Sequence, residues 1–348
     1  MTHFRKAVGL VALATALTVS SVAAGAAASD GIPANDDIVN AFSTNLTGGN
    51  GGLYPVVGTV TGATPDQPSD VIEFTDKRGP HSGGHSVWYR IPNPGRGRLR
   101  IAGVSRETNF DAVVAVYHGP ANGILSTADL APGPDGGNGQ RFGTRRTTAP
   151  IDVPTTPGFD YVVVADSYGG TVGVPITTFT LDASFTPAPV NDDIAGALPV
   201  DPNSGRGRLL GTVAGATSDQ PVDVTRFVGK HRTFLGDRSV WYKIAEPGAG
   251  RLRVAGISKR TGFDAGVAVF HGPAAGVAST ADLAPGPDGG NAQRFGSRRK
   301  TRPLEIVTTP GHDYYIAAFT LTRGSLPNYY PVIGGTDFGL DWRFTAAS

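Results

Sequence analysis

The chain has 348 residues, with 30 Lys and Arg against 29 Asp and Glu, and it contains no cysteine. The lack of cysteine excludes disulfides, thiolate metal sites and a cysteine nucleophile. The near-zero net charge gives no overall field that would attract nucleic acid or an anionic membrane, so no nucleic-acid partner is expected.

The N-terminal residues predict export. Arg5 and Lys6 precede a small, apolar stretch over residues 8–28, whose three final alanines offer a cleavage site near Ala28. Residues 1–29 therefore have the features of a signal peptide, and the mature chain is expected to be secreted. No later segment reaches the roughly 18 consecutive apolar residues of a membrane helix, so no membrane span is expected.

One pattern occurs twice in the chain, displaced by 153 residues (279 − 126 = 153). A constant displacement at several anchors indicates two copies of one domain, which we place at residues 30–187 and 188–348. The short, proline-rich join is typical of a semi-rigid spacer. The repeated stretches are 126–138 and 279–291, which are identical, 86–89 and 239–242, and 110–111 and 263–264.

Both copies read as strands joined by turns. Each opens with Asn-Asp-Asp-Ile, at 35–38 and 191–194, which could cap one short helix. Turn residues then recur about every 8–12 positions, which predicts an all-β chain of two tandem β-sandwich domains. Arg98 and Arg100 alternate with apolar neighbours, as on a half-exposed strand. The expected strands cover 56–60, 86–91, 98–103, 110–117, 161–165 and 179–185, then 240–244, 252–257, 263–270, 314–319 and 338–344.

An ordered set of motifs occurs in both copies: Asn-Asp-x-Ile, Gly-Ala-Thr, Ser-Val-Trp-Tyr, Phe-Asp before an apolar strand, and Pro-Gly-x-x-Tyr. In this order they resemble the bacterial pre-peptidase C-terminal (PPC) domain family. The resemblance implies a jelly-roll-like β-sandwich that serves as an accessory module on secreted proteases and other exported proteins; here we expect accessory modules alone. The chain departs from the family at His118 and His271, where a small polar residue is common, and in its thinned acidic loops at 134–138 and 287–291.

Calcium is the metal that an exported chain with oxygen ligands would most readily bind. The alternative is that the same residues form ordinary caps and turns. The repeat-matched oxygen donors are Asp36, Asp37, Asp135, Asn138, Asp192, Asp193, Asp288 and Asn291.

No catalytic residues are predicted. Asp111 and His118, like Asp264 and His271, lie seven positions apart on one expected strand, or about 23 Å, too far for an acid–base pair. His118 is expected in a loop at the end of that strand. His81 and His85 have the spacing of helical zinc ligands, but the two glycines between them prevent a good helix.

Three basic segments, at 96–106, 141–146 and 294–302, are interpreted as solvated faces; binding of an anionic polymer is the alternative. Weak binding candidates are Arg298 and Arg299, and Tyr329 and Tyr330 in an insertion that only the second copy carries. Trp88 and Trp241 are expected in the core rather than in a sugar platform.

The function predicted from these features is non-catalytic binding, by a monomer, of an extracellular protein, a polysaccharide or the cell envelope. The alternatives are a secreted hydrolase with its site at the domain junction, and a structural protein without a specific ligand.

Overall fold

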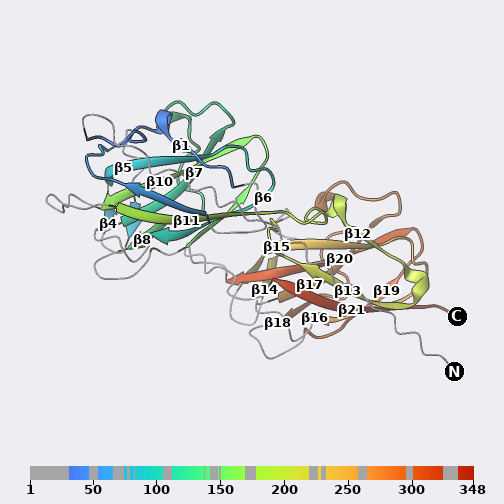
Figure 1. Cartoon of the computed structure of the whole chain (residues 1–348). Helices are drawn as coiled ribbons and strands as arrows, with labels where there is room; N and C mark the ends of the chain where they lie inside the picture. The colour runs from blue at the N-terminus through green and yellow to red at the C-terminus, as the bar shows by residue number, and fades with distance from the viewer. Residues whose placement is uncertain are drawn as a thin grey trace, which may run out of the picture.

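The computed structural model describes residues 31–46, 54–65, 74–76, 79–81, 83–104, 112–136, 138–141, 148, 150–168, 178–218, 226–228, 233–257, 265–294, 301–323 and 336–348. Figure 1 shows two strand-rich bodies joined by the segment that follows β11 (Thr178–Pro187). The all-β prediction with sandwich-like halves is confirmed, while the exact domain limits stay a prediction. In the described ranges, no helical segment has the length and apolar character needed to cross a membrane.

Two sheets form the first half, and every pairing in them except β1 with β5 is antiparallel. The five-stranded sheet has the order β1 (Phe42–Ser43), β5 (Gly83–Ile91), β10 (Phe159–Tyr168), β7 (Ala112–Pro120), β8 (Asn138–Arg141). The four-stranded sheet has the order β2 (Tyr54–Thr59), β11, β6 (Gly97–Val104), β9 (Ile151–Thr155). The remaining elements are the β3–β4 hairpin (Phe74–Asp76 and Gly79–His81) and the 3-10 turns η1 (Ile38–Asn40) and η2 (Thr127–Asp129).

The second half repeats this order of strands. Its larger sheet runs β12 (Leu198–Val200), β15 (Thr233–Ile244), β20 (His312–Arg323), β17 (Ala265–Pro273), β18 (Asn291–Arg294), with β14 (Arg226–Val228) also paired to β15. Its smaller sheet runs β13 (Arg206–Thr212), β21 (Asp337–Ala346), β16 (Gly250–Ile257), β19 (Leu304–Thr308). The 3-10 turns are η3 (Ile194–Gly196), η4 (Pro202–Ser204) and η5 (Thr280–Asp282).

Alternation along the strands gives each half two apolar clusters. Val87 and Tyr89 of β5 share a buried cluster with Phe179 of β11, between the two sheets. Their neighbour Trp88 points to the opposite face and packs with Tyr117 in a second cluster, which η1 and the loop after β7 help to close. Central strands are therefore covered on both faces, as their unbroken apolar runs predict. Trp88 and Trp241 are both 0% exposed, which confirms their assignment to the core.

The short helix expected after Asn-Asp-Asp is a single 3-10 turn in each half, η1 and η3. Asp37 and Asp193 stand at the N-cap positions, but neither side chain caps the turn. The aspartate before each of them instead binds a threonine on another loop, so this carboxylate is engaged in tertiary contacts.

Asp166 on β10 is a buried carboxylate that only the first half contains, since its repeat match is Phe319. Its Oδ1 accepts hydrogen bonds from the backbone N–H groups of Gly84 and His85 at 3.0 and 3.1 Å. Its Oδ2 is buried without a hydrogen-bond partner among the described residues. Burial raises the pKa of Asp166 to about 7, although the backbone hydrogen bonds act to lower it.

We predict that Asp166 makes the folded protein less stable as the pH rises from about 4 to 7. A raised pKa means that the folded state binds more protons than the unfolded state in this window, so stability falls with increasing pH, by up to about 4 kcal/mol in total. The variant Asp166→Asn removes this slope. Urea unfolding of both proteins at several pH values measures it; a difference in unfolding free energy that is constant with pH would contradict the prediction.

Candidate functional site

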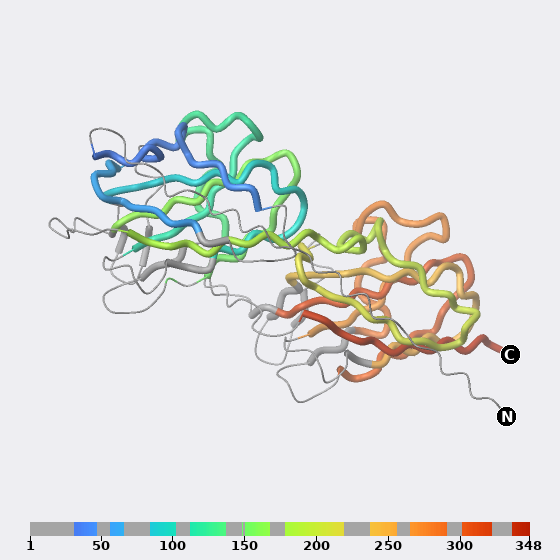
Figure 2. The backbone as a smooth tube through the Cα atoms, viewed as in Figure 1, coloured from blue at the N-terminus to red at the C-terminus, as the bar shows by residue number. Residues whose placement is uncertain are grey.

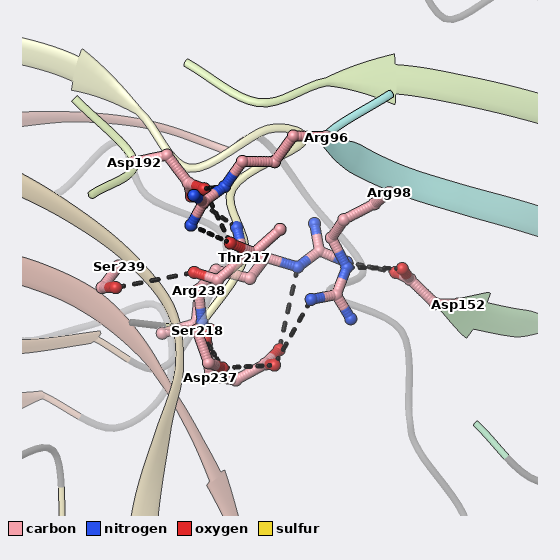
Figure 3. Close-up of polar contacts among 10 residues, drawn as sticks. Arg96, Arg98, Asp152, Asp192, Thr217, Ser218, Asp237, Arg238 and Ser239 are labelled. Carbon is pink, nitrogen blue, oxygen red and sulfur yellow. Dashed lines mark hydrogen bonds and ion pairs between the residues drawn. The ribbon is translucent and has the colours of Figure 1, made fainter. Parts of the chain in front are cut away.

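The two halves meet through arginine–aspartate contacts (Figure 3). Arg96, in the turn before β6, donates from Nε to Asp192 Oδ2 over 2.6 Å, and its two terminal nitrogens donate to the two oxygens of Asp193. Its Nη2 also donates to Thr217 Oγ1 at 3.0 Å. Because Asp192 and Asp193 directly precede η3, Arg96 binds the point at which the chain enters the second half.

A second cluster lies beside the first. Arg98 of β6 donates from Nε to Asp152 Oδ1 on β9 over 2.6 Å, and Arg238 of β15 donates from Nη2 to the other oxygen of Asp152. Arg98 Nη1 also reaches Asp237 Oδ1 on β15 at 3.4 Å. The side chains of Arg98, Asp152, Arg238 and Asp237 are only 4%, 5%, 8% and 11% exposed.

Charge balance makes this burial tolerable. Each ion removed from water costs several kcal/mol, a cost that is offset only when good geometry supplies a counter-charge. In the second cluster two arginines face two aspartates, and Asp152 bridges arginines from both halves. Burial acts to lower the pKa of Arg96, but the neighbouring Asp192 and Asp193 outweigh it and the pKa is raised. We call these seven residues the junction network: Arg96, Arg98, Asp152, Asp192, Asp193, Asp237 and Arg238.

The interpretation of residues 96–106 as a solvated face is wrong for Arg98, whereas Arg96 is 37% exposed and pairs with aspartates of the second half. Alternation correctly places Arg98 on the face of β6 that points away from the core of the first half. At Arg98 that face is not covered by water, because the second half packs over it, whereas Arg100 on the same face is exposed. The pattern of a single strand cannot distinguish solvent from a neighbouring domain.

The junction network occurs once, although the fold occurs twice. Displacement by 153 residues matches Arg96 with Ala249 and Asp152 with Glu305, and it matches Asp237 and Arg238 with Gly84 and His85. Glu305 is exposed and pairs only with Arg253 across the sheet surface, at 3.3 Å. If only residues shared by the two copies were taken as functional candidates, these residues would be missed. A junction that occurs once can be formed by residues that only one copy carries.

Among the described residues, the carboxylates at the junction are paired with arginines. Asp152, Asp192, Asp193 and Asp237 each contact an arginine.

A histidine–aspartate pair occurs in both halves. His118 Nδ1 lies 2.8 Å from Asp135, and His271 Nδ1 lies 2.9 Å from Asp288. His118 lies within β7, so its expected place in a strand-end loop is wrong. The rejection of Asp111 as a partner of His118 stays a prediction, because Asp111 lies outside the described residues. The loop after β7 folds back and brings Asp135, which the sequence analysis did not pair with His118, to the ring. Burial raises the pKa of Asp135, and the hydrogen bond with His118 acts to lower it.

The surroundings of the two pairs differ at one position. His118 contacts Phe159 edge-on at 5.1 Å between ring centroids, and Tyr161 at 5.9 Å. In the second half His312 replaces Phe159, with its ring 5.0 Å from that of His271. Both halves therefore have the same half-exposed histidine–aspartate pair. The ring that packs against the histidine differs, being Phe159 in the first half and His312 in the second.

The loop that carries each aspartate is the segment that is identical in both copies. Ser126 and Asp129 form a capping box around η2, and Ser279 and Asp282 repeat it around η5. Backbone hydrogen bonds to this box lower the pKa of Asp129 and Asp282. Further along, the loop is tied to β7 by Asp135 N–H donating to Val116 O at 2.7 Å. The capping box and the bond to β7 therefore hold the loop against the sheet.

The proposed calcium ligands have other partners or stand apart. Asp36 binds Thr64, Asp192 binds Thr217 and Arg96, and Asp193 binds Arg96. Asp37 is exposed. Asp135 and Asp288 bind the histidines, and Asn138 and Asn291 begin β8 and β18. Within the described ranges no three His, Cys, Asp or Glu side chains are grouped to hold a metal, and calcium stays a prediction.

Several sequence candidates lie outside the described residues. They are Arg298, Arg299, Tyr329, Tyr330, Asp264 and the basic residues 142–146.

We predict that Asp152→Asn lowers the free energy of unfolding by about 3 kcal/mol or more, because it removes the carboxylate between two buried arginines. The matched control is Glu305→Gln, at the same position of the second half. Glu305 is exposed, so its loss should cost less than about 1 kcal/mol. Chemical denaturation of both variants measures this contrast, and equal effects would show that the junction is not a buried ion network.

No protein-family model matches the chain, and no curated protein matches it. Among solved structures, the tandem CBM22 modules of Paenibacillus barcinonensis Xyn10C are 10% identical, with 77% of this chain and 86% of that chain covered and a TM-score of 0.25. The tandem CBM51 modules of a Streptococcus pneumoniae family 98 glycoside hydrolase are 9% identical, with 79% and 88% covered and a TM-score of 0.20. A Paenibacillus xanthan lyase is 14% identical, with 81% and 25% covered and a TM-score of 0.23.

Proposed function

We propose that the chain is an exported, non-catalytic protein of two PPC-like modules that binds one extracellular polysaccharide or protein surface through both modules at once. Both modules use the same loop, at residues 126–138 and 279–291. The junction network holds the loops in a fixed relative position.

The observation that carries this proposal is the distribution of identity between the copies. The buried strands β7 and β17 differ at two positions, Val113 against Gly266 and Tyr117 against Phe270. From residue 126 to 138 the loop that follows is identical to its match at 279–291, although Ala128, Pro132 and their matches in the second half are exposed. The five residues between the strand and this segment differ at three positions, 122, 124 and 125. Packing requires identity of buried residues before exposed ones. Here exposed loop residues are identical while buried strand residues differ. Contact of both loop surfaces with the same kind of ligand explains this observation.

The arrangement of the halves favours joint binding. Figure 2 shows the blue-green loop after β7 and the orange loop after β17 at the same upper side of the view. The junction network restricts rotation of one half against the other. When two linked sites can reach one surface, the second binding event becomes intramolecular, and overall affinity can rise by about 10²–10⁴-fold.

The chemistry of the loops points to polar recognition. Described aromatic side chains are buried or half-buried, so they offer no open platform for stacking on a sugar ring. The half-exposed groups are the histidine–aspartate pairs, whose carboxylates and rings can exchange hydrogen bonds with hydroxyl or amide groups. A glycan or a peptide backbone offers both kinds of group.

The test places a charged, larger side chain on the loop without touching its capping box. Ala128→Glu and Ala281→Glu are made singly and together, with Val307→Glu on the 70%-exposed surface of β19 as the control. Binding is measured by glycan array and by co-sedimentation with insoluble xylan, cellulose, chitin and bacterial cell-wall material.

Each single variant should weaken apparent binding by about 100-fold, since it leaves one module to bind alone. The double variant should not bind, and Val307→Glu should bind normally. A double variant that binds as well as the unmodified protein would exclude the loops as the site. The failure of the folded, unmodified protein to bind any of these materials would exclude polysaccharide as the ligand.

A further inference from the structure

The acceptor for Arg96 is built twice. In the second half Asp192 Oδ1 accepts from Thr217 N–H at 2.5 Å and Oδ2 accepts from the Thr217 hydroxyl at 2.6 Å. In the first half Asp36 makes the same two bonds to Thr64, at 2.6 and 2.7 Å. The next residue has nearly the same backbone in both, with φ and ψ of −89° and 144° at Asp37 and −94° and 152° at Asp193.

The surroundings of the acceptor also match. Asn35 Nδ2 donates to Trp88 O at 2.9 Å, and Asn191 Nδ2 donates to Trp241 O at 3.0 Å. The incoming chain follows one path in both halves. Gly62 and Gly215 both have a positive φ, and a Cβ on either would collide with a backbone oxygen of the segment that leads into the module, that of Gly31 or of Pro187.

Only one of the two acceptors is filled. Asp192, Asp193 and Thr217 hold the guanidinium of Arg96, which the preceding module supplies. Asp37 is exposed, and the structure gives its carboxylate no partner among the described residues. The first half thus contains a preformed acceptor whose twin in the same chain binds an arginine.

We propose that Asp36, Asp37 and Thr64 form a docking site for an arginine side chain on another protein, presented in the way that β6 presents Arg96. The bidentate fork of a guanidinium fits the two carboxylates, which a lysine ammonium cannot match. The paired arginine at the junction is direct evidence that this geometry accepts such a ligand.

A second copy of this chain, paired head to tail in the way that the two halves are joined, would not supply this arginine. In a head-to-tail pair, the second half of one copy would contact the first half of the next. The turn before β16 would then supply the arginine, but this turn has Ala249 where the first half has Arg96. The backbone there is otherwise equivalent: Ala347 N–H donates to Ala249 O at 2.9 Å, as Ala188 N–H donates to Arg96 O at 3.0 Å. The turn before β16 therefore lacks the arginine that the first half carries at the equivalent position.

This equivalence supplies a sharp test, the variant Ala249→Arg. It puts an arginine on the second half where the first half has Arg96, and it should make the full chain associate head to tail. Sedimentation velocity over a range of concentrations should show dimers and longer species. Ala249→Lys is the matched control and should associate at least 10-fold more weakly, because it loses the bidentate contact. Adding Asp37→Asn to Ala249→Arg should restore the behaviour of the unmodified protein.

A second measurement uses the unmodified chain. A short peptide, blocked at both ends and carrying one arginine, is titrated while the backbone amide signals of Thr64 and Thr217 are followed by NMR. Thr64 should shift and Thr217, whose site is filled, should not; a lysine peptide should have a weaker effect. The proposal is overturned if Ala249→Arg sediments as the unmodified protein does, if Asp37→Asn fails to reverse its association, or if the arginine peptide leaves Thr64 unchanged.

Discussion

The relative position of the two halves depends on a small set of arginines in the first half that donate hydrogen bonds to aspartates of the second half. Arg96 and Arg98 project from the β6 region of the first half, and each reaches aspartates of the second. Asp152 lies between Arg98 of its own half and Arg238 of the other half, so one carboxylate is shared across the junction. Separation of the two halves would expose these charged groups to water and break several charge-assisted hydrogen bonds at once. A short linker alone would not fix an orientation in this way.

Much of the fold follows from patterns that a reader can see in the sequence. Alternation and turn residues locate the strands, and the 153-residue displacement shows that one sandwich is built twice. The unbroken apolar runs of β7 and β10 correctly indicate strands that are covered on both faces. Strand positions and the burial of their two faces can be predicted in this way because the alternation of apolar and polar residues is visible in short stretches of sequence.

The site was harder to predict because its contacts join distant segments. His118 meets Asp135 only because the intervening loop turns back on β7, a return that no spacing rule reveals. Arg98 has the pattern of an exposed strand residue, and only the neighbouring domain makes it buried. Asp36 belongs to the Asn-Asp-Asp-Ile motif that is expected to cap a helix, but its carboxylate binds Thr64. In each case the side chain was identified as notable, and its partner was set by tertiary structure.

The two copies have diverged according to position in the tandem. Residues that shape the sandwich and the segment 126–138 are shared, whereas four residues that join the halves have no equivalent in the other copy: Arg96, Asp152, Asp237 and Arg238. Gly84, His85, Ala249 and Glu305 stand where the junction would otherwise be repeated. The junction between the two halves is therefore not repeated elsewhere among the described residues.

The most direct test of the fixed junction is the distribution of distances between the halves in solution. The chain has no cysteine, so spin labels can be placed at Leu125→Cys and Leu210→Cys, which are 69% and 75% exposed and lie on different halves. Double electron–electron resonance should give one narrow distance peak that broadens when Arg96 and Arg98 are both replaced by alanine. A broad distribution in the chain with both arginines intact would contradict the account, since the halves would then move independently.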